Sequence, residues 1–338
     1  MKERVLYLDI IRIIACIMII AMHAPIPNTG LSSYVLSTDS LLTAPGIGLF
    51  IMVSGALLLP VNMPTEQFLK KRFAKIVFPT VLWTLFYYMI APYTDTVTQG
   101  FGIKSFLSIP FSSQFNGVLW FMYMLAGLYL LAPIMSCWLR QASRREVEFY
   151  MCLWTIAMCY PLIRTYILVN EGYTGVLYYV SGYAGYFLLG YYLKSYVQTL
   201  PVWKCLFLIA IPVGVAVVLK VTHVTIDFYD LFGYLSIFVA MMAIAVFMAI
   251  KNIPISNDGN FKFQGGLITL SNCCFGIYLV HIFVMRTVVW HIPYVYQLSG
   301  VLQIAVVTAL TFIGSLIITM LISYMPGAEY LIGFKQKR

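Results

Sequence analysis

An arginine and a histidine near the start of the chain have a spacing that suits joint chemistry. Arg12 and His23 lie eleven residues apart in the stretch LDIIRIIACIMIIAMH. In an α-helix this separation is a rotation of about 1100°, within about 20° of three turns, and a rise of about 16 Å. The two side chains therefore share one helix face at different depths. Asp9 precedes Arg12 by three residues, which is close enough to pair with it.

Two interpretations of this helix face follow from the spacing. An ionisable group inside an apolar helix costs about 2.5–3.5 kcal/mol, so its presence needs a reason. In a catalytic interpretation the face offers a cation and a proton acceptor, since imidazole titrates near neutral pH. In a structural interpretation Asp9 and Arg12 form a pair that joins helices, Arg12 extends toward the membrane surface, and His23 is an ordinary interface residue. Spacing alone leaves both open.

A second group of candidates is the basic run Lys70, Lys71, Arg72 and Lys75. On a helix, Lys71 and Lys75 are spaced i,i+4 and Arg72 and Lys75 are spaced i,i+3, so several cations could bind one anion at a helix start. The same run can mark a cytoplasmic segment and attract anionic lipid headgroups. The residues by themselves favour the topological interpretation.

The other three histidines give weaker indications. His281, in FGIYLVHIFV, lies inside an apolar run, where a histidine either serves a function or hydrogen-bonds a neighbouring helix. His223 and Asp227 are spaced i,i+4 and could contact a metal, but two ligands in a loop are weak evidence for a site. His291 is most simply an interfacial residue.

Several classes of protein lack their signatures in this sequence. There is no Gly-rich Lys-Ser/Thr loop for nucleotide phosphates, no GxSxG elbow and no HExxH helix. Paired Gly/Pro-broken helices, which indicate secondary transport, are not evident. The seven cysteines lie in or beside apolar runs without metal-binding spacing, so we expect them to pack as small hydrophobic residues.

Membrane-spanning helices must position all these residues. The chain has 338 residues, of which 61% are hydrophobic and 10% charged, and its mean hydropathy is +0.88. A soluble domain carries about 25% charged residues, so lipid must surround most of this chain. The net charge of +9 sits in short segments between apolar runs, which favours membrane topology over nucleic-acid binding.

The predicted fold class is an all-α integral membrane protein with a bundle of about ten transmembrane helices. A span needs about 17–25 apolar residues. The N-terminal run is too long for a signal peptide and contains charges, so we interpret it as a retained first span. The expected spans lie near 5–25, 43–61, 76–92, 117–138, 148–168, 174–193, 203–220, 231–250, 267–289 and 299–325.

The lysines and arginines predict that both termini are cytoplasmic. With this orientation the inner segments hold Lys2, Arg4, Lys70, Lys71, Arg72, Lys75, Arg140, Arg144, Arg145, Lys194, Lys204, Lys251, Lys262, Lys335, Lys337 and Arg338. The outer segments hold Lys104, Arg164, Lys220 and Arg286, together with Asp39, Asp95, Glu171, Asp227 and Asp230. This asymmetry follows the positive-inside rule and supports an even number of spans.

Five segments, in order along nearly the whole chain, resemble the acyltransferase 3 family. They are the Arg12–His23 motif, APGIGLFIMVSGALLL at 44–59, FLKKRFAKIVFP at 68–79, VLWFMYMLAGLYLLAPIM at 118–135 and SNCCFGIYLVH at 271–281. Each motif alone is weak, but five in register are specific. The resemblance implies a single acyltransferase 3-type transmembrane domain over 1–338.

The sequence departs from the family pattern at two positions. Lys75 stands where the family usually has a second arginine, which keeps the charge but loses the bidentate fork. Val118 stands ahead of Leu119 and Trp120, where the family often has a histidine. This second departure puts in doubt any role of a histidine at that position.

The resemblance implies an acyl-CoA-dependent O-acyltransferase, which moves an acyl group, most often acetyl, from cytoplasmic acyl-CoA to a hydroxyl of a cell-envelope saccharide. His23 would then be the general base, and Arg12 would orient the donor or stabilise charge deeper in the membrane. Arg72 and Lys75, together with Lys71, would bind the CoA phosphates. The additional candidate residues are Asp9, Ser54, Trp120 and His281.

We expect acyl-CoA as a substrate, with no tightly bound cofactor and no metal. The expected location is the bacterial cytoplasmic membrane, with a saccharide acceptor and membrane lipid as partners and no nucleic acid. The alternative function is a flippase or exporter of a lipid-linked saccharide or polysaccharide, which would release no free CoA thiol. The sequence does not distinguish acetyl from succinyl, and it does not name the acceptor or the oligomeric state.

Overall fold

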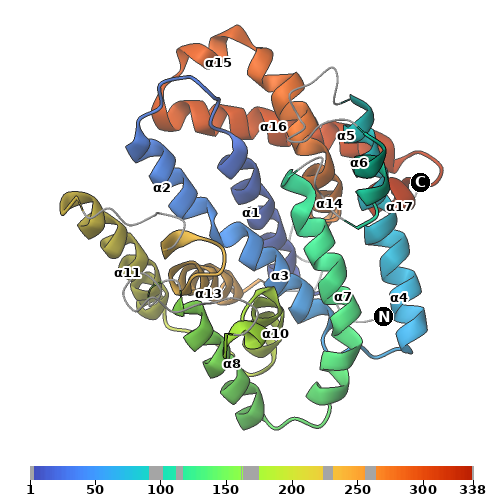
Figure 1. The fold of residues 1–338 in the computed structure, drawn as a ribbon, viewed down its shortest axis with the longest axis vertical. Helices are drawn as coiled ribbons and strands as arrows, with labels where there is room; N and C mark the ends of the chain where they lie inside the picture. The colour runs from blue at the N-terminus through green and yellow to red at the C-terminus, as the bar shows by residue number, and fades with distance from the viewer. Residues whose placement is uncertain are drawn as a thin grey trace. The chain divides into compact units, whose positions relative to one another are not determined.

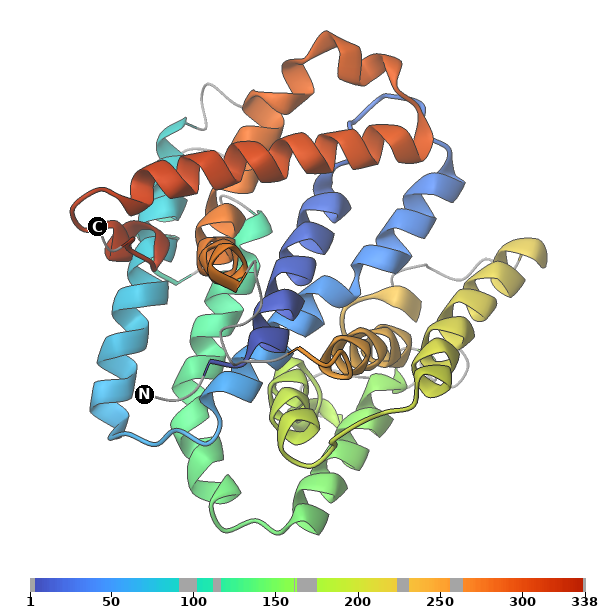
Figure 2. The same ribbon diagram turned by 180° about the vertical axis from the view of Figure 1, so that it is seen from behind.

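The computed structural model describes residues 4–90, 102–111, 117–160, 162, 175–223, 231–255 and 264–336, and helices make up its regular structure (Figures 1 and 2). These ranges contain no β-strand. Seven helical runs in them are long and apolar enough to cross a membrane: Leu6–His23, Ser33–Leu58, Thr65–Ile90, Gly117–Leu139, Val202–Val221, Gln264–His291 and Gly300–Ser323. The chain is an all-α, multi-pass membrane protein.

Each of these seven runs overlaps one expected span. The expected span 231–250 coincides with α13 (Ile237–Lys251), an apolar helix of 15 residues. The expected spans 148–168 and 174–193 coincide in part with α8 (Arg144–Met158) and α10 (Tyr183–Ser195). The count of ten spans and the cytoplasmic termini stay predictions. Among the charged residues that gave the predicted orientation, those outside the described ranges are Lys2, Asp95, Arg164, Glu171, Asp227, Asp230, Lys262, Lys337 and Arg338.

Two spans begin earlier in the structure than the sequence predicted. The second contains α2 (Ser33–Thr43) and α3 (Pro45–Leu58). The third contains α4 (Thr65–Arg72), the π-helix η1 (Phe73–Val77) and α5 (Phe78–Ile90) without a break. The basic run therefore belongs to the third helical run and not to the loop before it, because its charges lower the hydropathy without ending the helix.

The chain forms two compact units, which we describe separately. The first contains Met1–Ile19, Ser37–Val61 and Ile134–Gly265, and the second contains Ile20–Leu36, Asn62–Pro133 and Gly266–Arg338. The first thus holds most of α1 (Leu6–His23), with α3, α8, η4 (Tyr178–Val180), α10, α11 (Val202–Val221) and α13. The second holds α4, η1, α5, α6 (Ile103–Ser108), η3 (Gly117–Leu119), most of α7 (Trp120–Leu139), α14 (Gln264–Thr287), η5 (Val289–His291), α15 (Pro293–Gln297), α16 (Gly300–Ser323) and α17 (Ala328–Ile332).

In the first unit, α3 and α10 pack with their backbones in close approach. A Cβ atom at Gly55 would lie 1.8 Å from the carbonyl oxygen of Phe187, and one at Gly190 would lie 1.9 Å from that of Met52. Neither position has room for any side chain. Glycine allows helices to approach in this way inside a membrane, where dispersion contacts rather than exclusion of water hold them together.

Lysine side chains satisfy the carbonyl ends of these two helices. Lys194 donates from Nζ to the carbonyl of Ala56 near the end of α3, at 2.7 Å. Lys251 donates to the carbonyls of Leu193 (2.8 Å) and Val197 (2.6 Å) around the end of α10. The last carbonyls of a helix have no partner within it and carry its partial negative charge, so ammonium groups stabilise them.

In the second unit, α14 is held by several helices. A Cβ at Gly276 would lie 2.5 Å from the side chain of Thr319, so α14 packs closely on α16. The hydroxyl of Tyr87, on α5, donates to the carbonyl of Leu279 on α14 at 2.9 Å. Trp83, one turn earlier on α5, donates from Nε1 to the carbonyl of Leu331 in α17 at 2.9 Å. These contacts fix the part of α14 that carries His281.

The α3–α10 packing predicts opposite effects of one substitution at two helical glycines. In Gly190→Ala the new methyl group meets the backbone of Met52 and must separate the helices, which should cost about 1–3 kcal/mol of unfolding free energy. In Gly214→Ala, inside α11, a Cβ meets nothing within 4 Å, so the higher helix propensity of alanine should leave stability equal or slightly raised. Thermal unfolding of the detergent-solubilised variants checks this. Equal Tm values for the two variants would contradict it.

Candidate functional site

Two histidines from distant parts of the chain lie side by side in the second unit. His23 is the last residue of α1, and His281 lies in α14, which is drawn in orange in Figure 1. Their ring centroids are 5.7 Å apart and the rings are inclined by 37°. His281 is 1% exposed. The histidine that the sequence left between function and helix packing therefore neighbours the first candidate base.

The hydrogen bonds of His281 determine its tautomer. Its Nδ1 bonds the carbonyl oxygen of Tyr278, one turn earlier on α14. Because a carbonyl only accepts, Nδ1 carries the proton, and in a neutral ring Nε2 is then an acceptor. This Nε2 is buried and has no hydrogen-bond partner among the described residues. A buried acceptor without a partner is costly, and a catalytic role is one of the explanations for such an atom.

A cation accompanies the pair. The positive charge of Arg286, on α14, acts electrostatically on both His23 and His281. Its guanidinium stands 5.6 Å from the ring centroid of Trp290. The sequence had placed Arg286 only as an outer charge near a span end, because its spacing from His23 carries no signal. Two imidazoles and a guanidinium can together move a proton and stabilise a negative oxygen.

In the first unit, Asp9 of α1 is the centre of an ion-pair group. It is buried, and it accepts two hydrogen bonds from Arg4, at 2.8 and 2.9 Å. Nη1 of Arg12 lies 3.7 Å from Asp9. The predicted Asp9–Arg12 contact thus forms, but Arg4 makes the closer pair. The sequence placed Arg4 only among the inner charges, because it precedes the helix, where spacing does not predict contacts.

The basic run divides into one inward and several outward residues. Arg72, which ends α4, has its guanidinium carbon 5.6 Å from the ring centroid of Phe68 and 6.0 Å from that of Tyr129 on α7. Its Nε is buried and has no hydrogen-bond partner within the described ranges. Lys71 and Lys75 are exposed, and Lys75 lies in the π-helix η1. π-Helical turns are rare and often occur at functional sites.

The remaining candidates stand apart from the histidine pair. Ser54, in the first unit, donates its hydroxyl to the carbonyl of Phe50 at 3.0 Å, a local helical bond. Trp120 begins α7 and meets Phe121 edge to face at 6.3 Å. The described residues contain no group of three or more His, Cys, Asp or Glu side chains that could hold a metal. Of the suggested His223–Asp227 pair, Asp227 lies outside the described residues.

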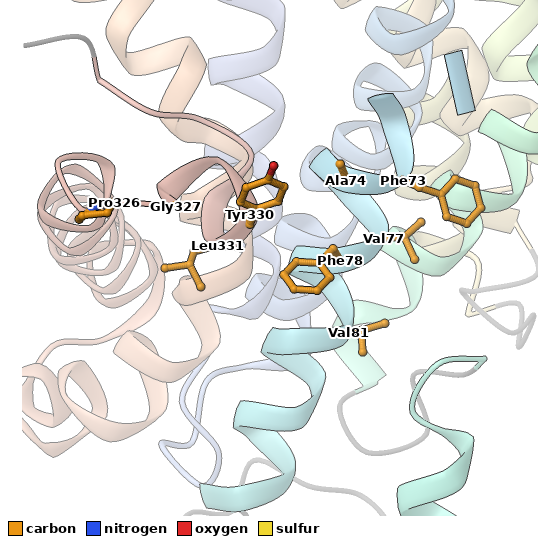
Figure 3. Close-up of a pocket in the computed structure, with 9 residues that line it drawn as sticks. All are labelled: Phe73, Ala74, Val77, Phe78, Val81, Pro326, Gly327, Tyr330 and Leu331. Atoms are coloured by element: carbon orange, nitrogen blue, oxygen red, sulfur yellow. The ribbon is translucent and has the colours of Figure 1, made fainter. Parts of the chain in front are cut away.

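A cleft in the second unit has neither histidine in its lining. It has a volume of about 730 Å³ and lies between the η1–α5 helix and the segment around α17 (Figure 3). Its lining is apolar except for the hydroxyl of Tyr330, whose ring meets Phe78 edge to face at 6.0 Å. The full lining is Phe73, Ala74, Val77, Phe78, Val81, Pro326, Gly327, Tyr330 and Leu331. A cleft without a base or a nucleophile suits hydrocarbon, not proton transfer.

Comparison with protein families decides the reaction class. The model of an acyltransferase domain, Acyl_transf_3, matches residues 5–320. The chain belongs to the acyltransferase 3 family. The site residues expected from the sequence, from Asp9 to His281, all lie within the matched range, so the family resemblance seen in the five motifs is confirmed over nearly the whole chain. This acyltransferase 3 protein shows no match to a curated protein and none to a solved structure.

Proposed function

We propose that this chain is an acyl-CoA-dependent O-acyltransferase, which moves an acetyl group from cytoplasmic acetyl-CoA to a hydroxyl of a cell-envelope saccharide. The observation that carries the proposal is the pair of imidazoles of His23 and His281, with ring centroids 5.7 Å apart. Transfer to a hydroxyl needs a group that removes its proton, and histidine does this most often near neutral pH. Membership of the acyltransferase 3 family supplies the reaction class.

In the proposed mechanism His23 is the general base. Its imidazole takes the proton of the acceptor hydroxyl while the oxygen attacks the thioester carbonyl, so a C–O bond forms and a tetrahedral intermediate results. The intermediate collapses as its C–S bond breaks. The CoA thiolate leaves and takes the proton from the His23 imidazolium. The products are the O-acetylated saccharide and CoA with a free thiol, and the base is restored.

We assign His281 to the base and Arg286 to the intermediate. With its proton on Nδ1, His281 has a buried Nε2 acceptor, which we assign to the N–H of the His23 imidazolium during the reaction. An orienting group beside the base is a recurrent feature of catalytic groups that act together. The charge of Arg286 acts on both rings, which supports its assignment to the negative oxygen of the tetrahedral intermediate.

We assign the donor to the basic helix. Arg72, with Lys71 and Lys75, binds the phosphates of CoA, since guanidinium and ammonium groups pair strongly with phosphate oxygens. The aromatic neighbours of Arg72 support this role, because they hold the guanidinium in place while its Nε lacks a described partner. Arg12 orients the donor, a role inferred from the family resemblance.

We further propose that the protein crosses the bacterial cytoplasmic membrane about ten times, with both termini in the cytoplasm and one domain over 1–338. The distribution of lysine and arginine supports this orientation. With it, the basic helix begins on the inner side, where acyl-CoA is found. His23 then ends the first span on the outer side, where an envelope acceptor arrives.

The role of His23 predicts a large and specific loss of activity on its substitution. In proteoliposomes supplied with acetyl-CoA and envelope saccharide, His23→Ala should lower the rate of CoA thiol release about 10²–10⁴-fold, the usual contribution of a general base. His291→Ala is the control, because His291 is exposed at the end of η5, and it should keep the wild-type rate.

Two results would contradict the proposal, and the second would favour the alternative function in transport. If His23→Ala keeps near-wild-type thiol release, His23 is not the base. If the wild-type protein moves saccharide across the membrane without release of CoA thiol, the chain is an exporter and not an acyltransferase.

The role of Arg72 predicts a change in donor affinity. Hydrogen bonds to charged groups contribute about 1.5–3 kcal/mol, so Arg72→Ala should raise the KM for acetyl-CoA about 10- to 100-fold with little change in the KM for the acceptor. Lys70→Ala removes one positive charge from the same turn of α4, at an exposed position, and should change neither value. An unchanged KM for acetyl-CoA in Arg72→Ala would contradict the role of Arg72 in donor binding.

A further inference from the structure

A buried tyrosine on α5 reaches into the helix that carries His281. Tyr87 is 0% exposed and lies in the span Thr65–Ile90. A tyrosine hydroxyl needs a hydrogen-bond partner when it is buried, and lipid supplies none. The partners of the Tyr87 hydroxyl are backbone groups of α14, so this side chain links α5 to α14.

The hydroxyl of Tyr87 hydrogen-bonds two backbone groups of one turn of α14. It donates to the carbonyl of Leu279 at 2.9 Å and accepts from the amide of Phe283 at 3.2 Å. In a regular α-helix these two groups pair with each other, since the amide of residue i bonds the carbonyl of residue i−4. A side chain inserted at such a point is one of the recognised causes of a local bend.

His281 is the central residue of the turn that Tyr87 engages. The turn runs from Leu279 to Phe283, and the Nδ1 bond of His281 goes to Tyr278, the residue just before it. The direction of the His281 ring therefore follows the local path of this backbone. A change in the path of the turn would move the ring relative to His23, whose centroid is 5.7 Å away.

Aromatic neighbours keep Tyr87 itself in place. Its ring centroid is 5.6 Å from that of Phe86 and 6.2 Å from that of Trp83, both on α5. Phe86 in turn meets the ring of Phe283 edge to face at 5.5 Å, so the cluster continues onto α14. These ring contacts restrict the movement of the Tyr87 side chain, as a positioning group requires.

A second tyrosine holds the same turn from α14 itself. The hydroxyl of Tyr278 donates to the carbonyl of Val118, in the turn η3 before α7. Its own carbonyl accepts the Nδ1 proton of His281. The backbone beneath His281 is thus tied to the entry of α7 through Tyr278 and to α5 through Tyr87.

We propose that Tyr87 is a positioning residue, whose hydroxyl sets the path of the turn Leu279–Phe283 and thereby the place of the His281 ring beside His23. The consequence for turnover rests on the proposed function, but the consequence for the ring does not. The competing view is that the hydroxyl only joins α5 to α14. Under that view its loss weakens the fold and leaves His281 as it was.

The test is Tyr87→Phe, which removes one oxygen and keeps the ring in its cluster. The freed amide and carbonyl of the turn can pair with each other, so the variant should fold. Tyr123→Phe is the matched control: its hydroxyl also donates to a backbone carbonyl, that of Ile109, and its described contacts do not include α14. The probe is ¹⁵N NMR of histidine-labelled protein, which is tractable because the chain has four histidines.

In Tyr87→Phe the His281 ring-nitrogen signals should move from their wild-type positions, and kcat for acetyl transfer should fall about 10- to 100-fold, as expected for a small misplacement of a catalytic group. The KM for acetyl-CoA should stay within about twofold. In Tyr123→Phe both the signals and kcat should match the wild type.

Unchanged His281 signals in Tyr87→Phe overturn the proposal, whether or not kcat falls, because any loss would then act by another route. Shifted signals support the positioning even if the wild-type protein releases no CoA thiol. In that case the proposed acetyl transfer fails and the structural role of Tyr87 stands.

Discussion

A polar group inside a membrane must find its partner within the protein, because the hydrocarbon around it offers no hydrogen bond. The arrangement around His281 follows from this constraint. Its Nδ1 proton is accepted by the backbone of its own helix, and that backbone is tied to α5 and η3 by two tyrosine hydroxyls. One atom of the group, Nε2 of His281, has no partner among the described residues. In the proposed mechanism this atom accepts a hydrogen bond from the N–H of the His23 imidazolium.

The same constraint explains the first unit. Its helices pack through glycines at positions 55 and 190, where no Cβ fits, and their carbonyl ends are bonded by Lys194 and Lys251. The sequence counted these two lysines as topology signals, and in the structure they also hydrogen-bond helix ends. A lysine beside a span can serve both purposes because its long stem lies along apolar surface while its charge reaches a polar group. The buried Asp9 group in α1 is a further case of pairing within the protein.

Much of the fold followed from the sequence because long apolar runs specify membrane helices. Seven of the expected spans coincide with long helices, and the family inferred from the motifs is confirmed. The starts of helices were less predictable. The charges from Lys70 to Lys75 lower the local hydropathy, so the third span was expected to begin after them, whereas the helix already begins at Thr65 and continues through the π-helix η1. Helical spacing also predicted the Asp9–Arg12 contact. Spacing could not predict that His281 meets His23, or that Tyr87 reaches α14, because contacts between distant segments depend on tertiary packing.

The central claim is that His23 and His281 act as one catalytic unit, and a double-mutant cycle on acetyl transfer tests it most directly. Single-turnover rates are measured for His23→Ala, His281→Ala and the double variant. Residues that act as a unit show strongly non-additive effects. If the two histidines act as one unit, the double variant is about as slow as His23→Ala alone. Two losses that multiply in the double variant would show that the histidines act independently, and would contradict the central claim.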